Sequence, residues 1–147
     1  MRINSQVATL APFTAVTSAP ISMSELESRV LTYEIGAAVN FVGRVRNHDH
    51  GRKVISLEYE AHPSADEVLA QIANTIAVDF DGVHIAAVHR TGKLAIGETA
   101  LGVVVAAAHR GAALAACSAL IEEIKASLPI WKLQTFDDGT TEWVNCL

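Results

Sequence analysis

Four cationic residues in the last third of the chain are placed to bind an anion. His109 and Arg110 follow the apolar run 101–108, and a helix-patterned segment begins directly after them. The first N–H groups of a helix have no partner within the helix, and the helix dipole favours negative charge at that end. A histidine and an arginine at such a junction are therefore suited to hold a phosphate or a carboxylate.

Two lysines extend this cationic set. Lys125 lies late in the same helix-patterned segment, and Lys132 follows Pro129, which ends that segment. A lysine that lies near other cations or is partly desolvated has a lowered pKa, and it can then transfer protons or attack a carbonyl. We predict that both lysines and the pair His109-Arg110 converge on one cleft and act on a phosphate-bearing small molecule.

Each of these residues also has a purely structural interpretation. His109 would then cap the helix, and Arg110 would be a solvated residue of its first turn. Lys125 would form a surface ion pair with Glu122, and such a pair contributes little to stability. Lys132 would be a charge at a strand edge that discourages aggregation. The chemical interpretation rests on all four cations occurring together.

The dipeptide His-Arg also occurs at positions 89–90. There it precedes a turn, so we expect Arg90 to bind backbone carbonyls or a carboxylate.

Phe41 and Arg46 are two further candidate site residues on one predicted strand. They have opposite parity in a regular strand and would face opposite sides of the sheet. Gly43 lies between them, at a position where a β-bulge would reset the alternation.

The composition indicates one globular domain. The chain has 147 residues, half of them apolar, which is enough to bury a core. The net charge of -5 argues against general affinity for nucleic acid. The six histidines match no metal-ligand motif, and Cys117 and Cys146 lie too far apart in sequence to match one. We expect Cys117 to be a buried apolar residue.

The sequence also bears on location. No apolar run reaches the length that spans a membrane, and the N-terminal segment lacks the apolar core of a secretory signal. Two unpaired thiols are typical of a reducing compartment. We therefore expect a cytoplasmic protein without a membrane segment.

The elements that must position the site follow from hydrophobic periodicity. Residues 1–15 are weakly patterned and are expected to form a loose leader, followed by one domain over 16–147. The predicted helices are 22–30, 64–80 with a capping box at its start, and 111–127. The predicted strands are 36–46, 54–61, 83–89, 94–96, the run up to 108, 130–136 and 141–146. We expect 36–46 to pair with 54–61, and the last two strands to form a hairpin. Tight turns between neighbouring strands favour an α+β fold over a doubly wound parallel sheet.

Several ordered motifs resemble the catalytic (large) subunit of molybdopterin synthase over residues 16–144. They are Phe41–Asn47, Leu57–Glu60, His89–Leu94 with Gly97-Glu98, Ala107–Arg110, and Lys125 with Pro129–Lys132 and Trp143. The resemblance implies an α/β hammerhead fold with an additional small antiparallel sheet. It also implies a homodimer at the centre of a heterotetramer.

The resemblance further implies an activity. Each catalytic subunit receives the C-terminal tail of a small ubiquitin-like partner, which ends in a Gly-Gly thiocarboxylate. Sulfur passes from that tail to cyclic pyranopterin monophosphate and builds the dithiolene of molybdopterin. The resemblance implies no metal or organic cofactor for this step.

The resemblance also assigns roles by position. His109-Arg110 would hold the substrate phosphate, Arg46 would be a further substrate contact, and Phe41 would line the pocket. Lys125 and Lys132 would be the catalytic lysines, with Lys132 near the thiocarboxylate and Lys125 in proton transfer. The alternative is a catalytically silent anion-binding or scaffold subunit of the same fold. The presence of both lysines beside His109-Arg110 favours the enzyme.

Overall fold

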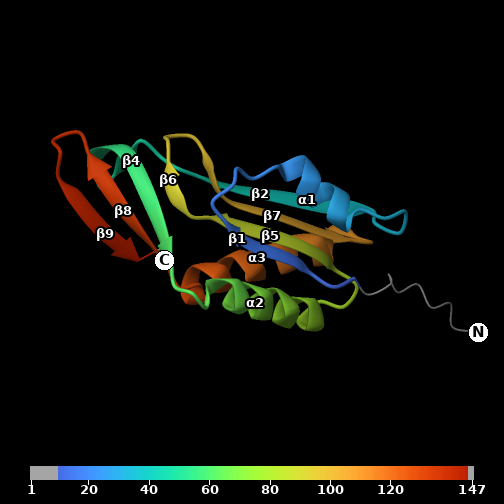
Figure 1. Ribbon diagram of the computed structural model, residues 1–147. Helices are drawn as coiled ribbons and strands as arrows, with labels where there is room; N and C mark the ends of the chain where they lie inside the picture. Colours follow the sequence, from blue (N-terminus) through green and yellow to red (C-terminus); the bar gives the residue numbers. More distant parts are fainter. Residues whose placement is uncertain (1–9, 146–147) are drawn as a thin grey trace, which may run out of the picture.

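A computed structural model describes residues 10–145 of the chain (Figure 1). Within this range three helices and nine strands follow one another along the sequence. In chain order they are β1 (Phe13–Thr17), α1 (Met23–Val30), β2 (Ala37–Arg44), β3 (His48–Asp49), β4 (Arg52–Ala61), α2 (Ala65–Asp79), β5 (His84–Arg90), β6 (Gly92–Leu94), β7 (Thr99–Ala107), α3 (Arg110–Ser127), β8 (Ile130–Phe136) and β9 (Thr141–Asn145).

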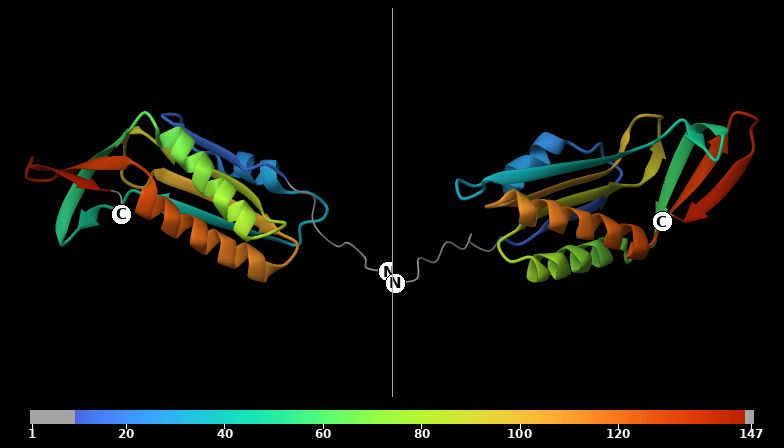
Figure 2. Two further views of the ribbon diagram at one scale, coloured as in Figure 1. Left: turned by 90° about the horizontal axis from the view of Figure 1, so that it is seen from below. Right: turned by 180° about the vertical axis from the view of Figure 1, so that it is seen from behind.

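The main sheet has the strand order β1-β5-β7-β2 and is covered on both faces. β1 is parallel to β5, whereas β5 and β2 both run antiparallel to β7. Helices α2 and α3 cover one face and α1 covers the other (Figures 1 and 2). Every residue of β5 is buried, which explains why its sequence lacks a polar face.

Two apolar layers hold this arrangement together. The larger lies between the sheet and the pair α2 and α3, and the smaller lies under α1. The helix side chains in these layers include Leu69, Ile72, Ile76, Ala113, Leu120 and Ile124 below the sheet, with Leu26 and Val30 above it. Because α3 packs along the sheet through this stripe, the layer fixes where both of its ends lie.

A smaller sheet stands beyond one end of the main sheet (Figures 1 and 2). Its order is β3-β4-β8-β9, with β6 also paired to β4, and all of these pairs are antiparallel. Val45, Leu57, Leu94 and Ala100 form a third apolar cluster. Ala100 belongs to β7 of the main sheet, so this cluster joins the two sheets.

The α+β fold, the three predicted helices and the C-terminal hairpin are confirmed. The predicted pairing of 36–46 with 54–61 is wrong, because β2 pairs with β7 and β4 pairs with β8. The polar segment that follows β2 carries the chain out of the main sheet, and β4 then finds a long partner in β8.

Two local predictions at chain and helix starts are also wrong. Phe13–Thr17 forms β1, so the last residues of the predicted leader 1–15 belong to the main sheet, while residues 1–9 lie outside the described part of the chain. The capping box at Ser64 does not form, because its backbone is helical and its hydroxyl contacts His62 Nδ1 at 2.8 Å. Asp66 Oδ1 instead accepts a hydrogen bond from the backbone N–H of Val16 at 2.8 Å and ties α2 to β1.

Candidate active site

The first part of the site is the junction of β7 and α3. His109 has extended backbone dihedral angles (φ -129°, ψ 149°) and occupies the N-cap position, but its side chain makes no capping hydrogen bond. Both His109 and Arg110 are exposed, and within residues 10–145 neither side chain has an ion-pair partner. They line a pocket together with Gly36, Ala37, Ala108 and Gly111. The pocket therefore offers an imidazole and a guanidinium without ion-pair partners in the described residues, beside a helix N-terminus.

Gly36 brings the start of β2 against this junction. Its N–H donates to the carbonyl of Ala107 at 3.1 Å. A Cβ on Gly36 would lie 2.4 Å from the carbonyl oxygen of Ala108, which is closer than any side chain tolerates. Glycine is therefore required here, next to the residue that precedes His109.

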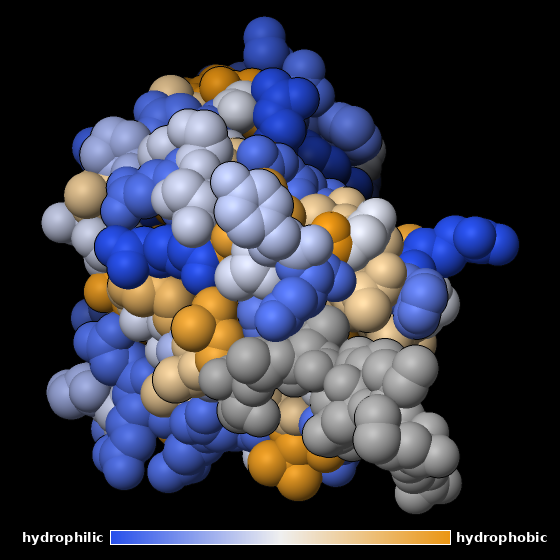
Figure 3. Space-filling view, turned by 90° about the vertical axis from the view of Figure 1, so that its right-hand side faces the viewer, coloured by the Kyte–Doolittle hydropathy of each residue, from blue (hydrophilic) through white to orange (hydrophobic). Residues whose placement is uncertain are grey.

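Figure 3 shows the end of the molecule at which α3 begins. Hydrophilic side chains make up much of this surface, with smaller apolar areas between them. A charged ligand would meet polar surroundings here. The phosphate role predicted for His109-Arg110 is compatible with this surface.

The second part of the site lies where the small sheet meets the main sheet. Lys132 on β8 lies opposite Tyr59 on β4, and the two side chains line one small pocket. Arg46 lines the same pocket, as do Arg44, Val45, His48, Leu57 and Gln134. The neighbouring Trp131 is exposed and does not line this pocket, as expected for adjacent residues of a strand. No ion pair involves Lys132 within the described residues.

Lys125 lies in the last turn of α3. This end of α3 points toward the small sheet, which carries the pocket of Lys132 (Figure 1). The predicted ion pair of Lys125 with Glu122 is absent from residues 10–145. Burial lowers the pKa of the neighbouring His89 to about 4, and the charge of Lys125 contributes to that lowering. His89 is therefore neutral near pH 7, with Nδ1–H donating to the Arg90 carbonyl at 2.8 Å. Its ring meets Tyr59 edge to face at 5.0 Å, so the two sheets touch beside Lys125.

The prediction that four cations share one cleft is wrong for a single chain. Lys125 follows Arg110 by 15 positions, which corresponds to about 22 Å along a helix. The two ends of α3 lie at opposite ends of the main sheet (Figures 1 and 2). A helix that runs back along its sheet must separate its own ends in this way. Arg46, Lys125 and Lys132 gather at one end, and His109-Arg110 stands at the other.

A register irregularity lies at the expected place, between Gly43 and Arg44, but the extra residue is Ala100 of β7, because Gly43 pairs with Leu101 and Arg44 with Thr99. The expected reset of the alternation in β2 is therefore wrong, since burial alternates without a break from Ala37 to Arg44. Arg46 nevertheless lines the pocket of Lys132. Phe41 packs against the core under α2 and α3 and is not among the residues that line either pocket.

The first His-Arg pair is structural, as expected. Arg90 is buried, its Nη1 donates to Glu98 Oε2, and its Nη2 donates to the Ser18 carbonyl at 3.3 Å. The Arg90 guanidinium lowers the pKa of the Glu98 carboxyl, so this carboxylate remains ionised. Cys117 is buried, also as expected, and burial raises the pKa of its thiol. Cys146 lies outside the described residues.

Sequence reasoning missed a polar pair, of which Gln134 lines the pocket of Lys132 and Asp49 contacts Gln134. Gln134 is buried at 2 % exposure, and its Nε2 donates to Asp49 Oδ2 at 2.8 Å. That hydrogen bond is the largest cause of a lowered pKa of Asp49. The only signal in the sequence is that Gln134 shares the strand face of Lys132. Its partner lies 85 positions away and carries no local signature.

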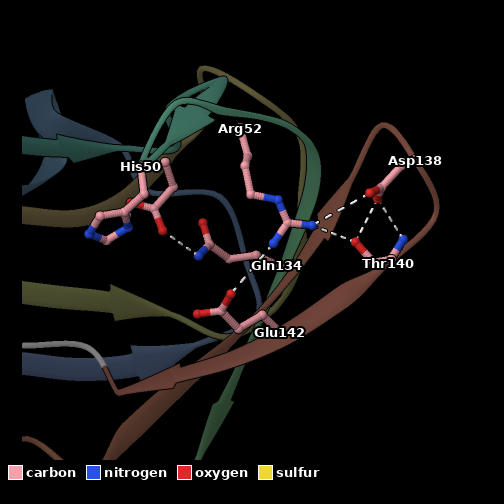
Figure 4. Close-up of polar contacts among 7 residues, drawn as sticks. His50, Arg52, Gln134, Asp138, Thr140 and Glu142 are labelled. Carbon is pink, nitrogen blue, oxygen red and sulfur yellow. Dashed lines mark hydrogen bonds and ion pairs between the residues drawn. The ribbon is translucent and has the colours of Figure 1, made fainter.

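Arg52 holds the β8–β9 hairpin against β4 beside this pair (Figure 4). Its Nη2 donates to Thr140 Oγ1 at 2.6 Å, and its guanidinium lies 3.6 Å from the ring centroid of Phe136. Asp138 and Glu142 add ion pairs at 3.7 and 3.8 Å. The strand that carries Lys132 is therefore tied at its far end by several independent contacts.

Within residues 10–145 no group of three or more histidine, cysteine or carboxylate side chains is placed to hold a metal ion. None of the helices in that range is long and apolar enough to cross a membrane.

Comparisons with known proteins give the family. The family model of the MoaE protein matches residues 16–127. The molybdopterin synthase catalytic subunit of Rattus norvegicus is 39% identical over 128 residues, which is 86% of this chain and 64% of the rat protein, slightly under two thirds of its length. The crystal structure of molybdopterin synthase from Staphylococcus aureus has a TM-score of 0.83 and 35% identity, covering 88% of this chain and 94% of that one.

A more distant structure shares the fold. The complex of subunits 1 and 2 of molybdopterin-converting factor from Helicobacter pylori contains a chain with a TM-score of 0.66 and 19% identity, covering 92% of this chain and 90% of that one. The family match spans both the strand that leads to Arg46 and the whole of α3 with Lys125. On this basis the chain belongs to the MoaE family, to which molybdopterin synthase catalytic subunits belong.

Proposed function

We propose that this chain catalyses sulfur transfer to cyclic pyranopterin monophosphate and so forms the dithiolene of molybdopterin. The sulfur donor is the C-terminal thiocarboxylate of a small ubiquitin-like subunit. Family membership supports this assignment, and so does the subunit complex known for the Helicobacter pylori relative. The observation that carries it is the gathering of Lys132, Arg46 and Lys125 at one end of the molecule, where neither lysine has an ion-pair partner within the described residues.

The chemistry requires such cations. Attack on a thiocarboxylate or departure of a phosphate oxygen develops negative charge, which fixed cations in a water-poor pocket stabilise. Lys132 lines the pocket and polarises the thiocarboxylate carbonyl. Lys125 transfers a proton and stabilises charge as the cyclic phosphate opens. Arg46 contacts the substrate, and His109-Arg110 binds its phosphate.

The separation within one chain leads to a second part of the proposal. About 22 Å between the ends of α3 is too far for one small substrate to contact both cationic groups. We propose that the active unit is a homodimer within a heterotetramer, in which His109-Arg110 of one copy faces Lys125 and Lys132 of the other. Two-fold dimers bring the same two surfaces together twice, so two equal sites result.

Reconstitution with a thiocarboxylated small subunit and cyclic pyranopterin monophosphate tests the activity. Lys132→Ala should lower the rate of dithiolene formation by about a hundredfold or more, because the charge that polarises the carbonyl is lost. Lys93→Ala is the matched control, since Lys93 is an exposed lysine of the same sheet that lies opposite Glu58. If Lys132→Ala turned over at the wild-type rate, the catalytic assignment would be wrong. Binding without turnover by the wild-type chain would instead favour the silent scaffold.

A further inference from the structure

We propose that Asp49 is a positioning residue, which holds Arg46 at the pocket of Lys132 and is itself held by Gln134. This inference rests on the proposed function, because Arg46 matters only if the pocket receives the substrate. Neither Asp49 nor Gln134 belongs to the motifs through which the chain resembles its family.

Gln134 anchors Asp49 to the small sheet. It lies two positions after Lys132 on β8, so the two side chains point to the same face of the strand. Its amide is buried, and Nε2 donates to Asp49 Oδ2 at 2.8 Å. Figure 4 shows the Gln134 amide directed at the carboxylate next to His50. A buried amide with a short hydrogen bond is a rigid support, because breaking the bond leaves a buried polar group unpaired.

The second carboxylate oxygen faces the segment that carries Arg46. Asp49 Oδ1 lies 3.7 Å from Arg46 Nη2 and 3.1 Å from His50 Nδ1. The Asp49 side chain is only 15% exposed, whereas that of Arg46 is 63% exposed. The fixed partner in this ion pair is therefore Asp49, and the mobile partner is Arg46. His50 follows with a positive φ of 49°, an unusual conformation for a non-glycine residue, and it begins the tight turn between β3 and β4.

The charge of Asp49 suits this role. Its pKa is lowered chiefly by the hydrogen bond from Gln134, and the charge of Lys132 adds to the effect. The carboxylate therefore stays ionised at neutral pH. An exposed arginine gains little stability from one carboxylate, so the consequence is for the position of Arg46 and not for the stability of the fold.

Removal of the carboxylate has two opposite effects on an anionic substrate. It releases Arg46, which raises KM, and it removes a like charge, which lowers KM. We expect the first effect to be the larger. Besides Arg46, the carboxylate of Asp49 has two further partners, which are Gln134 and His50. These two partners offset part of its charge.

Asp49→Asn tests the proposal in the reconstituted enzyme, because asparagine keeps the size of the side chain and an acceptor for Gln134. We expect KM for cyclic pyranopterin monophosphate to rise by about threefold to fivefold, the range of an exposed ion pair. We expect kcat to stay within about twofold, since the lysines are untouched. Asp138→Asn is the matched control, because Asp138 lies in the turn between β8 and β9 and pairs with Arg52 instead of Arg46.

A double-mutant cycle separates positioning from general loss of structure. If Asp49 acts through Arg46, then Asp49→Asn causes no further rise in KM in an Arg46→Ala background. Gln134→Leu removes the supporting amide without changing any charge, and it should raise KM in the same direction even if Asp49→Asn proves unstable.

Three results would overturn the proposal: a KM for Asp49→Asn equal to or below the wild-type value, additive effects with Arg46→Ala, or an equal rise in KM for Asp138→Asn. These results are distinguishable from failure of the proposed function. If Lys132→Ala is inactive while Asp49→Asn has a wild-type KM, only the role of Asp49 is wrong. If Lys132→Ala keeps full activity, the proposed function itself is wrong.

Discussion

The ring of Tyr59 meets the imidazole of His89 edge to face, with ring centroids 5.0 Å apart and planes at 76°. Tyr59 belongs to the small sheet and lines the pocket of Lys132, whereas His89 belongs to the buried centre of the main sheet. The contact places a neutral aromatic pair where the two sheets meet. His89 also lies close enough to Lys125 for the charge of that lysine to lower the pKa of the imidazole.

The protonation of His89 should make the fold sensitive to mild acid. Its pKa is lowered from 6.5 to about 4, first by burial, so the unfolded chain binds this proton more readily than the folded one. Stability is therefore greatest above pH 6.5 and falls as the pH decreases toward 4, by about 2.5 kcal/mol between pH 7 and pH 4.5. Urea unfolding at the two pH values measures the loss. His89→Asn should remove most of it, because the amide can still donate to the Arg90 carbonyl and does not titrate.

A control accompanies this prediction. His62 is exposed, and His62→Asn should leave the difference between the two pH values nearly unchanged. The window lies above the ordinary pKa of Asp49, 3.8, and reaches that of Glu98, 4.5, only at its lower end. Because both pKa values are lowered in the fold, these two carboxylates add to the loss of stability only near pH 4.5. An equal pH dependence in wild type and His89→Asn would contradict the assignment to His89.

The close approach at Gly36 should matter for substrate binding as well as stability. In Gly36→Ala the new methyl group would meet the Ala108 carbonyl oxygen at 2.4 Å, so the backbone next to His109 must move. We expect a loss of about 1–3 kcal/mol in stability, together with a several-fold higher KM. Thermal unfolding and steady-state kinetics measure the two effects.

Gly102→Ala is the matched control for strain alone. Its added Cβ would lie 2.8 Å from Ile21 Cγ2 and from Met23 Sδ, on the face of the main sheet covered by α1. This variant should also lose stability, but its KM should stay at the wild-type value. If KM followed stability equally in both variants, Gly36 would have no specific role at the His109-Arg110 pocket.

Much of the fold could be predicted because its signals are local. The stop at Pro129 and the C-terminal hairpin each depend on neighbouring residues, and each is found in the structure. The alternation predicted for 54–61 holds only from Leu57 on, because the register of β4 shifts between Val54 and Ser56 and Ile55 is exposed. The pairing of β2 with β7 is not local, since nothing within β2 identifies its partner. The sequence does not predict β1, because Phe13–Thr17 mixes apolar and polar residues without a regular alternation. These five residues form a strand because they pair with the buried strand β5.

The positions of the candidate site residues also depend on contacts between segments that are far apart in sequence. Residue type and position suffice to identify four residues that could bind an anion or act in catalysis: His109, Arg110, Lys125 and Lys132. Their relative placement depends on the direction of α3 along the sheet, and sequence proximity is misleading there because a long helix separates its ends. The contact of Asp49 with Gln134 depends on two strands of the small sheet that are far apart in sequence.

The proposed dimer makes a prediction that a single-chain site cannot satisfy. Arg110→Ala and Lys132→Ala each damage every site when present in both copies of a homodimer. In a heterodimer of the two variants, a shared site would combine the intact lysine of one copy with the intact arginine of the other, while the second site would carry both defects. Co-expression with two different affinity tags allows the heterodimer to be isolated in two steps. Its rate should be about half that of the wild-type dimer.

The matched control combines two changes from the same pocket. Arg46 and Lys132 line one pocket of one chain, so a heterodimer of Arg46→Ala with Lys132→Ala has a defect in each of its sites. That heterodimer should regain no more activity than the less damaged of its two parents. Recovery by Arg110→Ala with Lys132→Ala, and none by the same-pocket pair, places His109-Arg110 of one copy opposite the lysines of the other. Absence of recovery in both heterodimers would mean that the two cationic groups do not meet across the dimer, and the phosphate would then be bound by Arg46 and the lysines alone.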